Sequence, residues 1–292
     1  MSQSELPEFD TLWDYAKPAA SEARFRQLLA ETHARSEPAD RAELLTQIAR
    51  AQGLQRHFDA AHTTLDAALA LLCQDDRRAK ARYLLERGRV FNSAGAPAIA
   101  HGLFLDAWKL ARACGADALA IDAAHMLAIV ESGEAALQWN QGALELALAS
   151  TDPRARRWLG SLYNNLGWAY HEAGAFERAL EVFTLAADNW AAEGRDADAR
   201  TARWASAHTL RSLGRVKEAL TAQRALLAET ERAGVTDGYI LEEIGECLLA
   251  LGRADEATSY FAQAFDALST DDQLVEREPE RLRRLRTLGS AG

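Results

Sequence analysis

Apolar and small residues recur at steps of three and four along most of the chain, which is the spacing of side chains on one face of an α-helix. The pattern is clearest in the stretch 163–186. Tyr163, Leu166 and Tyr170 share one face of an expected first helix, and Gly167 lies among them. Because glycine has no side chain, a second helix can approach the first closely at this point. The stretch therefore predicts a helix shaped to pack against a partner.

The second half of the same stretch predicts that partner. Ala179, Phe183 and Ala186 are spaced by four and three residues, so a second helix presents a bulky ring between two small side chains. Gly174 lies between the two helices, where a glycine in the left-handed conformation commonly ends a helix. The stretch as a whole predicts a helical hairpin.

The hairpin pattern returns about every 40 residues. The small residue of the first helix recurs at Ala49, Gly88, Ala128, Gly167, Ala207 and Gly245. The small residue of the second helix recurs at Ala61, Ala100, Ala136, Ala179, Ala219 and Ala257. The two landmarks are 12 residues apart in five repeats and 8 apart in the third, so we expect the third hairpin to lack about one turn. The bulky position holds Leu65, Phe104, Phe183 and Phe261, but Asn140 in the third repeat and Gln223 in the fifth.

An aromatic residue, Leu-Gly, a second aromatic residue and then Ala-x-x-x-Phe resemble the tetratricopeptide repeat. The spacing here exceeds the usual length of about 34 residues in that family, which predicts longer helices rather than long loops. The resemblance implies an all-α, right-handed solenoid, or superhelix, of about six hairpins with capping helices at both ends.

We expect three segments along the chain. Three aromatic residues near the N-terminus, Phe9, Trp13 and Tyr15, are followed by a helix and are expected to cover the first repeat. Asp152-Pro153 is a helix-start signal that opens the fourth repeat. After a polar break at 269–273, a short basic helix is expected to cover the last repeat. The predicted segments are 1–39 for the N-terminal segment and capping helix, 40–269 for six repeats, and 270–292 for the C-terminal capping helix and tail.

Charge and cysteine content narrow the possible partners and location. The 292 residues carry a net charge of −10, which argues against a general nucleic-acid binder. Cys73, Cys114 and Cys247 are far apart and form no zinc or CxxC pattern, so we expect reduced thiols. The acidic N-terminus has no signal-peptide pattern, and no apolar run is long enough to span a membrane. We expect a cytoplasmic protein with neither nucleic acid nor membrane as a partner.

The resemblance also implies where a ligand binds. In the family, the ligand-facing positions lie three before, one after and four after the small residue of each first helix, and we call these positions the first-helix row. The candidate binding residues in this row are Arg50, Arg89, Asn92, His125, Asn164, Trp168, His171, Trp204, His208, Arg211, Glu242 and Glu246.

The composition of this row suits an extended peptide in a concave groove. Arginines at its N-terminal end, Arg50 and Arg89, and glutamates at its C-terminal end, Glu242 and Glu246, would orient such a peptide by charge. The alternative is that these side chains satisfy one another between adjacent helices. A clamp for a terminal carboxylate is disfavoured because the lysine-rich pattern of that clamp is missing.

Three functional classes remain open from the sequence. The first is a non-catalytic scaffold or adaptor that binds a peptide or protein. The second is a regulatory sensor that acts through a separate effector, because repeats of about 40 residues resemble those of bacterial peptide-responsive regulators. The third uses His125, His171 and His208, with Glu131 or Glu242, as a metal site or as acid and base. No catalytic or cofactor motif is present, so we expect no enzyme activity and no cofactor. The oligomeric state stays open between monomer and homodimer.

Overall fold

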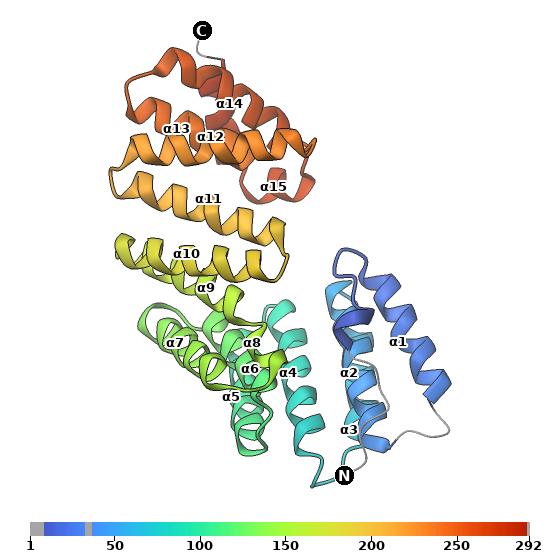
Figure 1. Ribbon diagram of the computed structural model, residues 1–292. Helices are drawn as coiled ribbons and strands as arrows, with labels where there is room; N and C mark the ends of the chain where they lie inside the picture. Colours follow the sequence, from blue (N-terminus) through green and yellow to red (C-terminus); the bar gives the residue numbers. More distant parts are fainter. Residues whose placement is uncertain (1–8, 33–36, 291–292) are drawn as a thin grey trace. The chain divides into compact units, whose positions relative to one another are not determined.

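A computed structural model describes residues 9–32 and 37–290 (Figure 1). Within these residues the chain is helical apart from short connections and contains no strand. It divides into two compact units, Met1–Leu159 and Gly160–Gly292. The first unit contains η1 (Phe9–Leu12), α1 (Pro18–Thr32), α2 (Pro38–Leu54), α3 (Phe58–Leu69), α4 (Arg77–Ser93), α5 (Pro97–Ala113), α6 (Asp117–Val130), α7 (Gly133–Ala149) and α8 (Pro153–Arg156).

Almost all of α9 (Leu159–Glu172) belongs to the second unit. The remaining helices of this unit are α10 (Phe176–Ala192), α11 (Asp196–Ser212), α12 (Val216–Arg232), α13 (Gly238–Ala250), α14 (Ala254–Leu268), α15 (Asp272–Arg277) and α16 (Pro279–Gly289). Helices α10 to α14 follow one another as packed layers, and α16 packs on α14 (Figure 1).

Twelve of these helices form the six expected hairpins. The pairs are α2/α3, α4/α5, α6/α7, α9/α10, α11/α12 and α13/α14, and each predicted small residue lies in its expected helix. The prediction of an all-α solenoid of helical hairpins is therefore confirmed.

The extra length of the repeats lies in the helices. Helices α2, α4, α5, α7, α10, α11 and α12 each have 17 residues. The third hairpin is shorter, as expected. Helix α6 ends at Val130, two residues after Ala128, and only Glu131 and Ser132 connect it to α7.

Glycine and phenylalanine fit together in alternate hairpins. A Cβ atom on Gly88, Gly167 or Gly245 would lie 2.5, 2.4 and 2.7 Å from the ring of Phe104, Phe183 and Phe261, respectively. These rings are buried, so the missing side chain is what admits them. In the first, third and fifth hairpins the first helix has alanine instead, and the facing residue is Leu65, Asn140 or Gln223.

Both ends of the repeat array are covered by the chain itself. At the N-terminal end, Phe9 and Trp13 pack with Phe25 of α1 against Leu44 and Ile48 of α2. At the C-terminal end, Leu282 and Leu285 of α16 join the core of the last hairpin. None of the described helices is apolar over a length that would cross a bilayer.

Two local predictions need correction. Asp152 caps a helix, as expected, but this is the one-turn helix α8, and the fourth repeat begins separately at Leu159. The expected polar break at 269–273 is shorter than predicted, because α15 begins at Asp272. The side chain of Asp271 accepts hydrogen bonds from the backbone N–H groups of Gln273 and Leu274, which stabilises the start of this polar helix.

Candidate ligand-binding site on the first helices

In the first unit, the first-helix row is a network of ion pairs. Arg50 of α2 and Arg89 of α4 both contact Oε1 of Glu86, at 3.4 and 2.6 Å, and Arg89 also pairs with Asp122 of α6. Glu86 is fully buried. Burial alone would lower the pKa of Arg50, but Glu86, Tyr15 and Asp122 together outweigh this effect and the pKa is raised. The two predicted arginines are therefore brought together by Glu86, and both are already engaged in ion pairs.

Two further predicted residues belong to this unit, His125 and Asn92. The ring of His125 packs 5.4 Å from the ring of Trp158. Burial lowers the pKa of His125; Asp122 opposes this effect, while Arg89 and Arg50 add to it. The imidazole is therefore neutral at pH 7. Asn92 is half-buried near the end of α4.

In the second unit, the row carries a cluster of rings from α9 and α11. Trp168 and His171 come from α9, and Trp204 and His208 come from α11; we call these four residues the aromatic cluster. The ring centroids of Trp204 and His208 are 5.5 Å apart at an interplanar angle of 19°, which is a stacked arrangement. Trp168 lies 6.1 Å from Trp204, and His171 lies 5.0 Å from His208. All four side chains are partly exposed, so a ligand can reach them.

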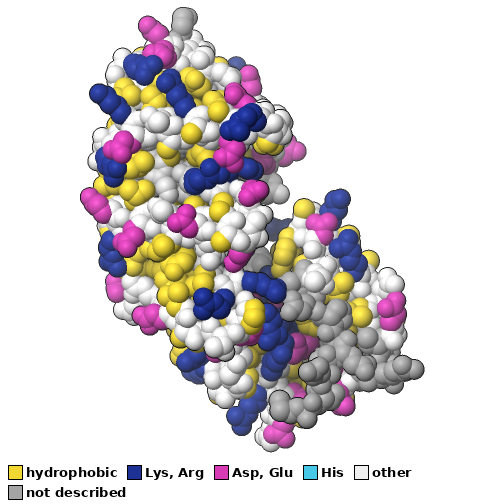
Figure 2. All heavy atoms as spheres, viewed as in Figure 1, with side chains coloured by type: hydrophobic (Ala, Val, Ile, Leu, Met, Phe, Trp, Pro, Cys, Tyr) yellow, Lys and Arg dark blue, Asp and Glu magenta, His cyan; other side chains and the backbone are white. Residues whose placement is uncertain are grey.

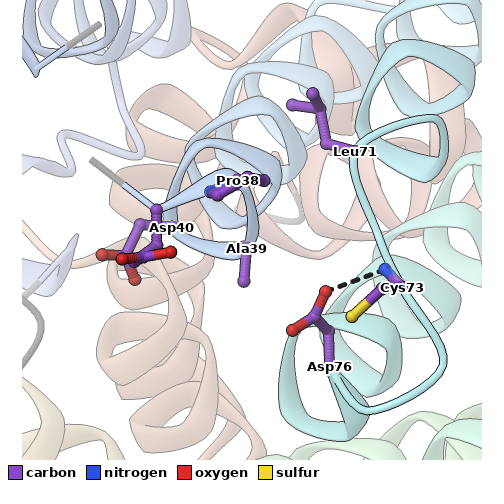
Figure 3. A pocket seen from close by; sticks show the side chains of 7 residues that line it. Pro38, Ala39, Asp40, Leu71, Cys73 and Asp76 are labelled. Carbon is purple, nitrogen blue, oxygen red and sulfur yellow. Dashed lines mark hydrogen bonds between the residues drawn. The ribbon is translucent and has the colours of Figure 1, made fainter. Parts of the chain in front are cut away.

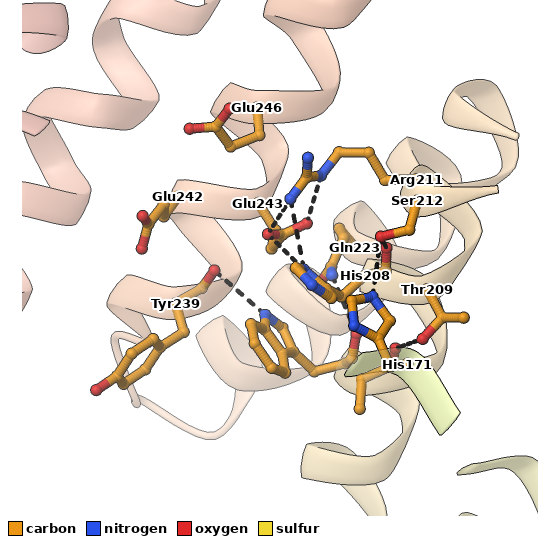
Figure 4. Close-up of polar contacts among 12 residues, drawn as sticks. His171, His208, Thr209, Arg211, Ser212, Gln223, Tyr239, Glu242, Glu243 and Glu246 are labelled. Carbon is orange, nitrogen blue, oxygen red and sulfur yellow. Dashed lines mark hydrogen bonds and ion pairs between the residues drawn. The ribbon is translucent and has the colours of Figure 1, made fainter. Parts of the chain in front are cut away.

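The aromatic cluster is held by a buried carboxylate of α13 (Figure 4). Nδ1 of His208 lies 2.8 Å from Oε1 of Glu243, and Arg211 donates two hydrogen bonds to Glu243, each 2.9 Å long. Burial raises the pKa of Glu243, but the hydrogen bonds from His208 and Arg211 more than offset this and lower it to about 2. Glu243 is therefore ionised at neutral pH, and His208 donates to it through Nδ1.

The second histidine of the cluster contacts a serine instead of a carboxylate. Nε2 of His171 lies 2.9 Å from Oγ of Ser212 on α11. Burial lowers the pKa of His171, and His208 and Arg211 lower it further, while Glu172 and Glu243 oppose the change. His171 is therefore a neutral imidazole at pH 7.

The remaining predicted acidic residues pair with the C-terminal helix. Arg281 of α16 donates to both carboxylate oxygens of Glu242, at 3.2 and 2.9 Å, and Arg284 pairs with Glu246. The Arg281 guanidinium also lies 4.9 Å from the ring of Tyr239. The indole Nε1–H of Trp204 donates to the carbonyl oxygen of Tyr239 at 3.2 Å, which fixes this indole in place.

Asn164, the remaining candidate of this unit, lies one turn before Trp168 on α9. Its Oδ1 atom is buried and accepts no hydrogen bond from any described group. The predicted residues of the second unit therefore divide into the aromatic cluster, two glutamates paired with α16, Arg211 paired with Glu243, and this asparagine.

Sequence reasoning missed Glu86 and Glu243, the two carboxylates that organise the row. Each lies two positions before the small residue of its own repeat. Glu86 contacts Arg50 and Glu243 contacts His208, and each of these partners lies one position after the small residue of the preceding repeat. Gln47 holds the same position in the first repeat and accepts a 3.0 Å hydrogen bond from Nε1 of Trp13, which precedes the repeats. The paired residues are 34 to 36 positions apart in the sequence. A comparison of neighbouring repeats at this offset would have found them.

The acidic partners expected for a histidine metal site lie elsewhere. Glu131 pairs with His101 at 2.8 Å, and Glu242 pairs with Arg281. Of the three histidines, His171 and His208 are brought together, whereas His125 lies in the first unit against Trp158. Among the residues that the structure describes, no three His, Cys, Asp or Glu side chains are grouped so that they could hold a metal ion.

Two depressions on the surface lie outside the first-helix row. One open depression of about 470 Å³ is lined by Glu37, Pro38, Ala39, Asp40, Leu71, Cys73 and Asp76 (Figure 3). Another, of about 400 Å³, is lined by residues of α14 and nearby loops. No candidate binding residue lines either one. On the face of the second unit seen in Figure 2, basic and acidic side chains are interspersed, which is typical of a solvated surface.

Comparison with known proteins places the fold in context. The family model described as a tetratricopeptide repeat matches residues 160–188. No curated protein sequence matches the chain. A signal transduction ATPase with a tetratricopeptide repeat sensor, from Pyrococcus horikoshii, superposes with a TM-score of 0.71 at 14% identity. The similarity covers 93% of this chain and 43% of the ATPase, so the chain spans less than half of that protein.

Two further solved structures have the same fold. NprR in complex with its cognate peptide NprX gives a TM-score of 0.55 at 15% identity and covers 96% of this chain and 80% of NprR. A Rap protein complexed with competence and sporulation factor gives 0.53 at 17% identity and covers 99% of this chain and 87% of Rap. At such identities the similarity shows a shared fold. The chain therefore contains a tetratricopeptide repeat at residues 160–188, and its six hairpins have the fold of tetratricopeptide repeat proteins.

Proposed function

We propose that this protein is a non-catalytic scaffold or adaptor that binds a peptide or protein segment through its first-helix row, chiefly at the aromatic cluster. The observation that carries the proposal is the presence of two partly exposed tryptophans on neighbouring first helices. The ring centroids of Trp168 and Trp204 lie 6.1 Å apart; Trp204 stacks on His208, and the ring of Trp168 lies 6.0 Å from that of His208 in a tilted arrangement. Tryptophan is the side chain most enriched at binding hot spots, because it combines a large apolar area with few rotatable bonds.

The rigidity of the cluster supports the same function. The Trp204 indole is fixed by its hydrogen bond to the Tyr239 carbonyl, and His208 is fixed by Glu243. A ligand that binds rings already held in place loses less conformational entropy than one that must order them. The cluster is therefore suited to recognition without a large rearrangement.

A regulatory sensor is the second candidate. NprR and Rap share this fold; NprR forms a complex with its cognate peptide, and Rap forms a complex with competence and sporulation factor. The ATPase of similar fold carries its repeats as a sensor. On this alternative, a peptide bound at the same cluster changes how the chain contacts a separate effector. The division into an N-terminal cap, six repeats and a C-terminal cap, and a cytoplasmic location, remain part of the proposal.

Selection from a displayed library of short peptides tests the proposal. We expect the full chain to enrich related peptides, and Trp168→Ala or Trp204→Ala to abolish that enrichment. Leu185→Ala is the matched control, because Leu185 is an exposed apolar residue on α10 in the same unit, outside the row. Enrichment that survives both tryptophan variants would move the binding site elsewhere.

A further inference from the structure

We propose that the aromatic cluster recognises an uncharged peptide segment that carries a ring, so that binding depends on stacking and not on charge. This inference rests on the proposed function and specifies its ligand. It replaces the expectation from the sequence that arginines and glutamates of the row orient a charged peptide. The reason lies in the partners that the structure gives to each charged group near the cluster.

Each cation beside the cluster already has a carboxylate. Arg211 donates two hydrogen bonds to Glu243, Arg281 donates to both oxygens of Glu242, and Arg284 pairs with Glu246. The three carboxylates are at most partly exposed, with side-chain exposures of 7%, 11% and 17%. A charged ligand group would have to displace one member of a pair and leave the other without its partner in a poorly solvated place.

A ligand anion is further disfavoured by the same carboxylates. Glu242, Glu243 and Glu246 lie on one helix, α13, and an acidic ligand group that approached Arg211 would lie next to Glu243. Like charges at such distances repel strongly where water is partly excluded. An acidic peptide therefore gains little from Arg211.

A ligand cation is disfavoured for the complementary reason. Stacked rings attract cations, and Tyr239 at the edge of the cluster already carries the Arg281 guanidinium at 4.9 Å. On the other side, a guanidinium nitrogen of Arg211 lies 3.5 Å from Nδ1 of His208. A second cation above His208 or Trp204 would be repelled by Arg211.

The features that remain for a ligand are neutral. The partly exposed faces of Trp168 and Trp204 offer stacking surface for an aromatic or proline ring. Nδ1 of His208 is engaged with Glu243, and no described group hydrogen-bonds to its Nε2. This nitrogen is therefore available to a polar group of the peptide backbone. A ring next to a polar backbone group is the ligand chemistry that these residues match.

The test is peptide selection on the full chain at two salt concentrations. The Debye length falls from about 10 Å in about 0.1 M NaCl to about 3 Å in about 1 M NaCl. We expect the same peptides to be enriched at both concentrations, with Trp, Tyr, Phe or Pro frequent and charged residues rare. For a synthetic peptide from this pool, we expect the dissociation constant to change less than about twofold between the two conditions. Replacing its central neutral residue by Asp or by Lys should weaken binding in both cases.

The outcomes separate this inference from the proposed function. Enriched peptides rich in Asp, Glu, Arg or Lys, with binding lost at high salt and on Trp204→Ala, would overturn the inference and leave the proposed function standing. Enrichment that does not depend on Trp168 or Trp204 would overturn both. Salt-independent enrichment of neutral ring-bearing peptides that requires both tryptophans supports both.

Discussion

The first-helix rows of the two units use the same repeat geometry for different chemistry. In the first unit, Arg50, Glu86, Arg89 and Asp122 form a chain of ion pairs around a fully buried carboxylate. In the second unit, stacked and partly exposed rings occupy the corresponding positions, and one ion-paired carboxylate, Glu243, supports them from behind. The first row joins helices to one another, whereas the second leaves surface for a ligand.

This difference shows that membership of the row does not by itself make a residue a binding residue. A buried charge is engaged with its partner, and separating the two costs free energy before any ligand is bound. A ring held at its edge still presents a face. Position in the repeat therefore says where a ligand can reach, and the partners of each side chain say whether it is available.

The largest expected effect tests what the two units share. Phe104→Ala in the first unit and Phe183→Ala in the second each remove a buried ring that fills the space above a glycine. We expect each change to lower the free energy of unfolding by about 3–5 kcal/mol, measured by chemical denaturation. A loss below about 1 kcal/mol in either variant would contradict the shared packing.

The ion-pair network of the first unit should matter for stability and not for binding. Glu86→Ala leaves the Arg50 and Arg89 guanidinium groups without their common carboxylate. We expect it to cost about 3–5 kcal/mol of unfolding free energy, because a charge without its partner is left in a poorly solvated place. Peptide binding by the folded variant should equal that of the unchanged protein. Loss of binding in a variant that is still folded would show that the first row takes part in recognition.

Acid should weaken the support of the aromatic cluster. The pKa of Glu243 in the folded protein, about 2, lies below its ordinary value of 4.5, so its stabilisation is present above about pH 4.5 and is lost as the pH falls toward 2. The shift corresponds to about 3 kcal/mol. Denaturation of the protein and of Glu243→Gln across this range should show the difference in stability between them shrinking as the pH falls. A constant difference would mean that Glu243 is not held ionised by Arg211 and His208.

The aromatic cluster should matter for peptide binding, whereas the ion-pair network should matter for stability. Trp204→Ala removes a stacking face, and we expect peptide affinity to fall at least about tenfold, which is about 1.4 kcal/mol. Isothermal titration with a selected peptide measures the change, and circular dichroism checks the fold. Arg89→Gln in the first unit provides the comparison, with affinity expected to stay the same. Equal losses in the two variants would remove the distinction between the rows.

The smallest effect is expected from an ion pair on the surface. Arg203 and Glu229 pair at 2.9 Å, with side chains 45% and 31% exposed. Arg203→Ala should cost about 0.2–1 kcal/mol and less at high salt, by chemical denaturation at two ionic strengths. A cost as large as that of Glu86→Ala would mean that burial does not distinguish the two kinds of pair.

The features that the sequence predicted are those set by spacing within one repeat. Gly167 and Phe183 lie on facing helices of one hairpin, and the period of three and four residues locates both. The shortened third hairpin also follows from spacing alone. Contacts between neighbouring repeats, such as Glu243 with His208, join residues 35 positions apart, and no local pattern marks them. Helix α15 was missed because its start depends on a cap by Asp271 and not on an apolar period.

The seven tryptophans allow one direct measurement of the central claim. Each indole N–H gives its own nuclear magnetic resonance signal, which single Trp→Phe variants assign. On addition of a selected peptide, we predict shifts for Trp168 and Trp204 and unchanged signals for Trp108 and Trp139 of the first unit and for Trp190, which is buried. Shifts confined to tryptophans of the first unit, with Trp168 and Trp204 unaffected, would contradict the assignment of the aromatic cluster as the binding site.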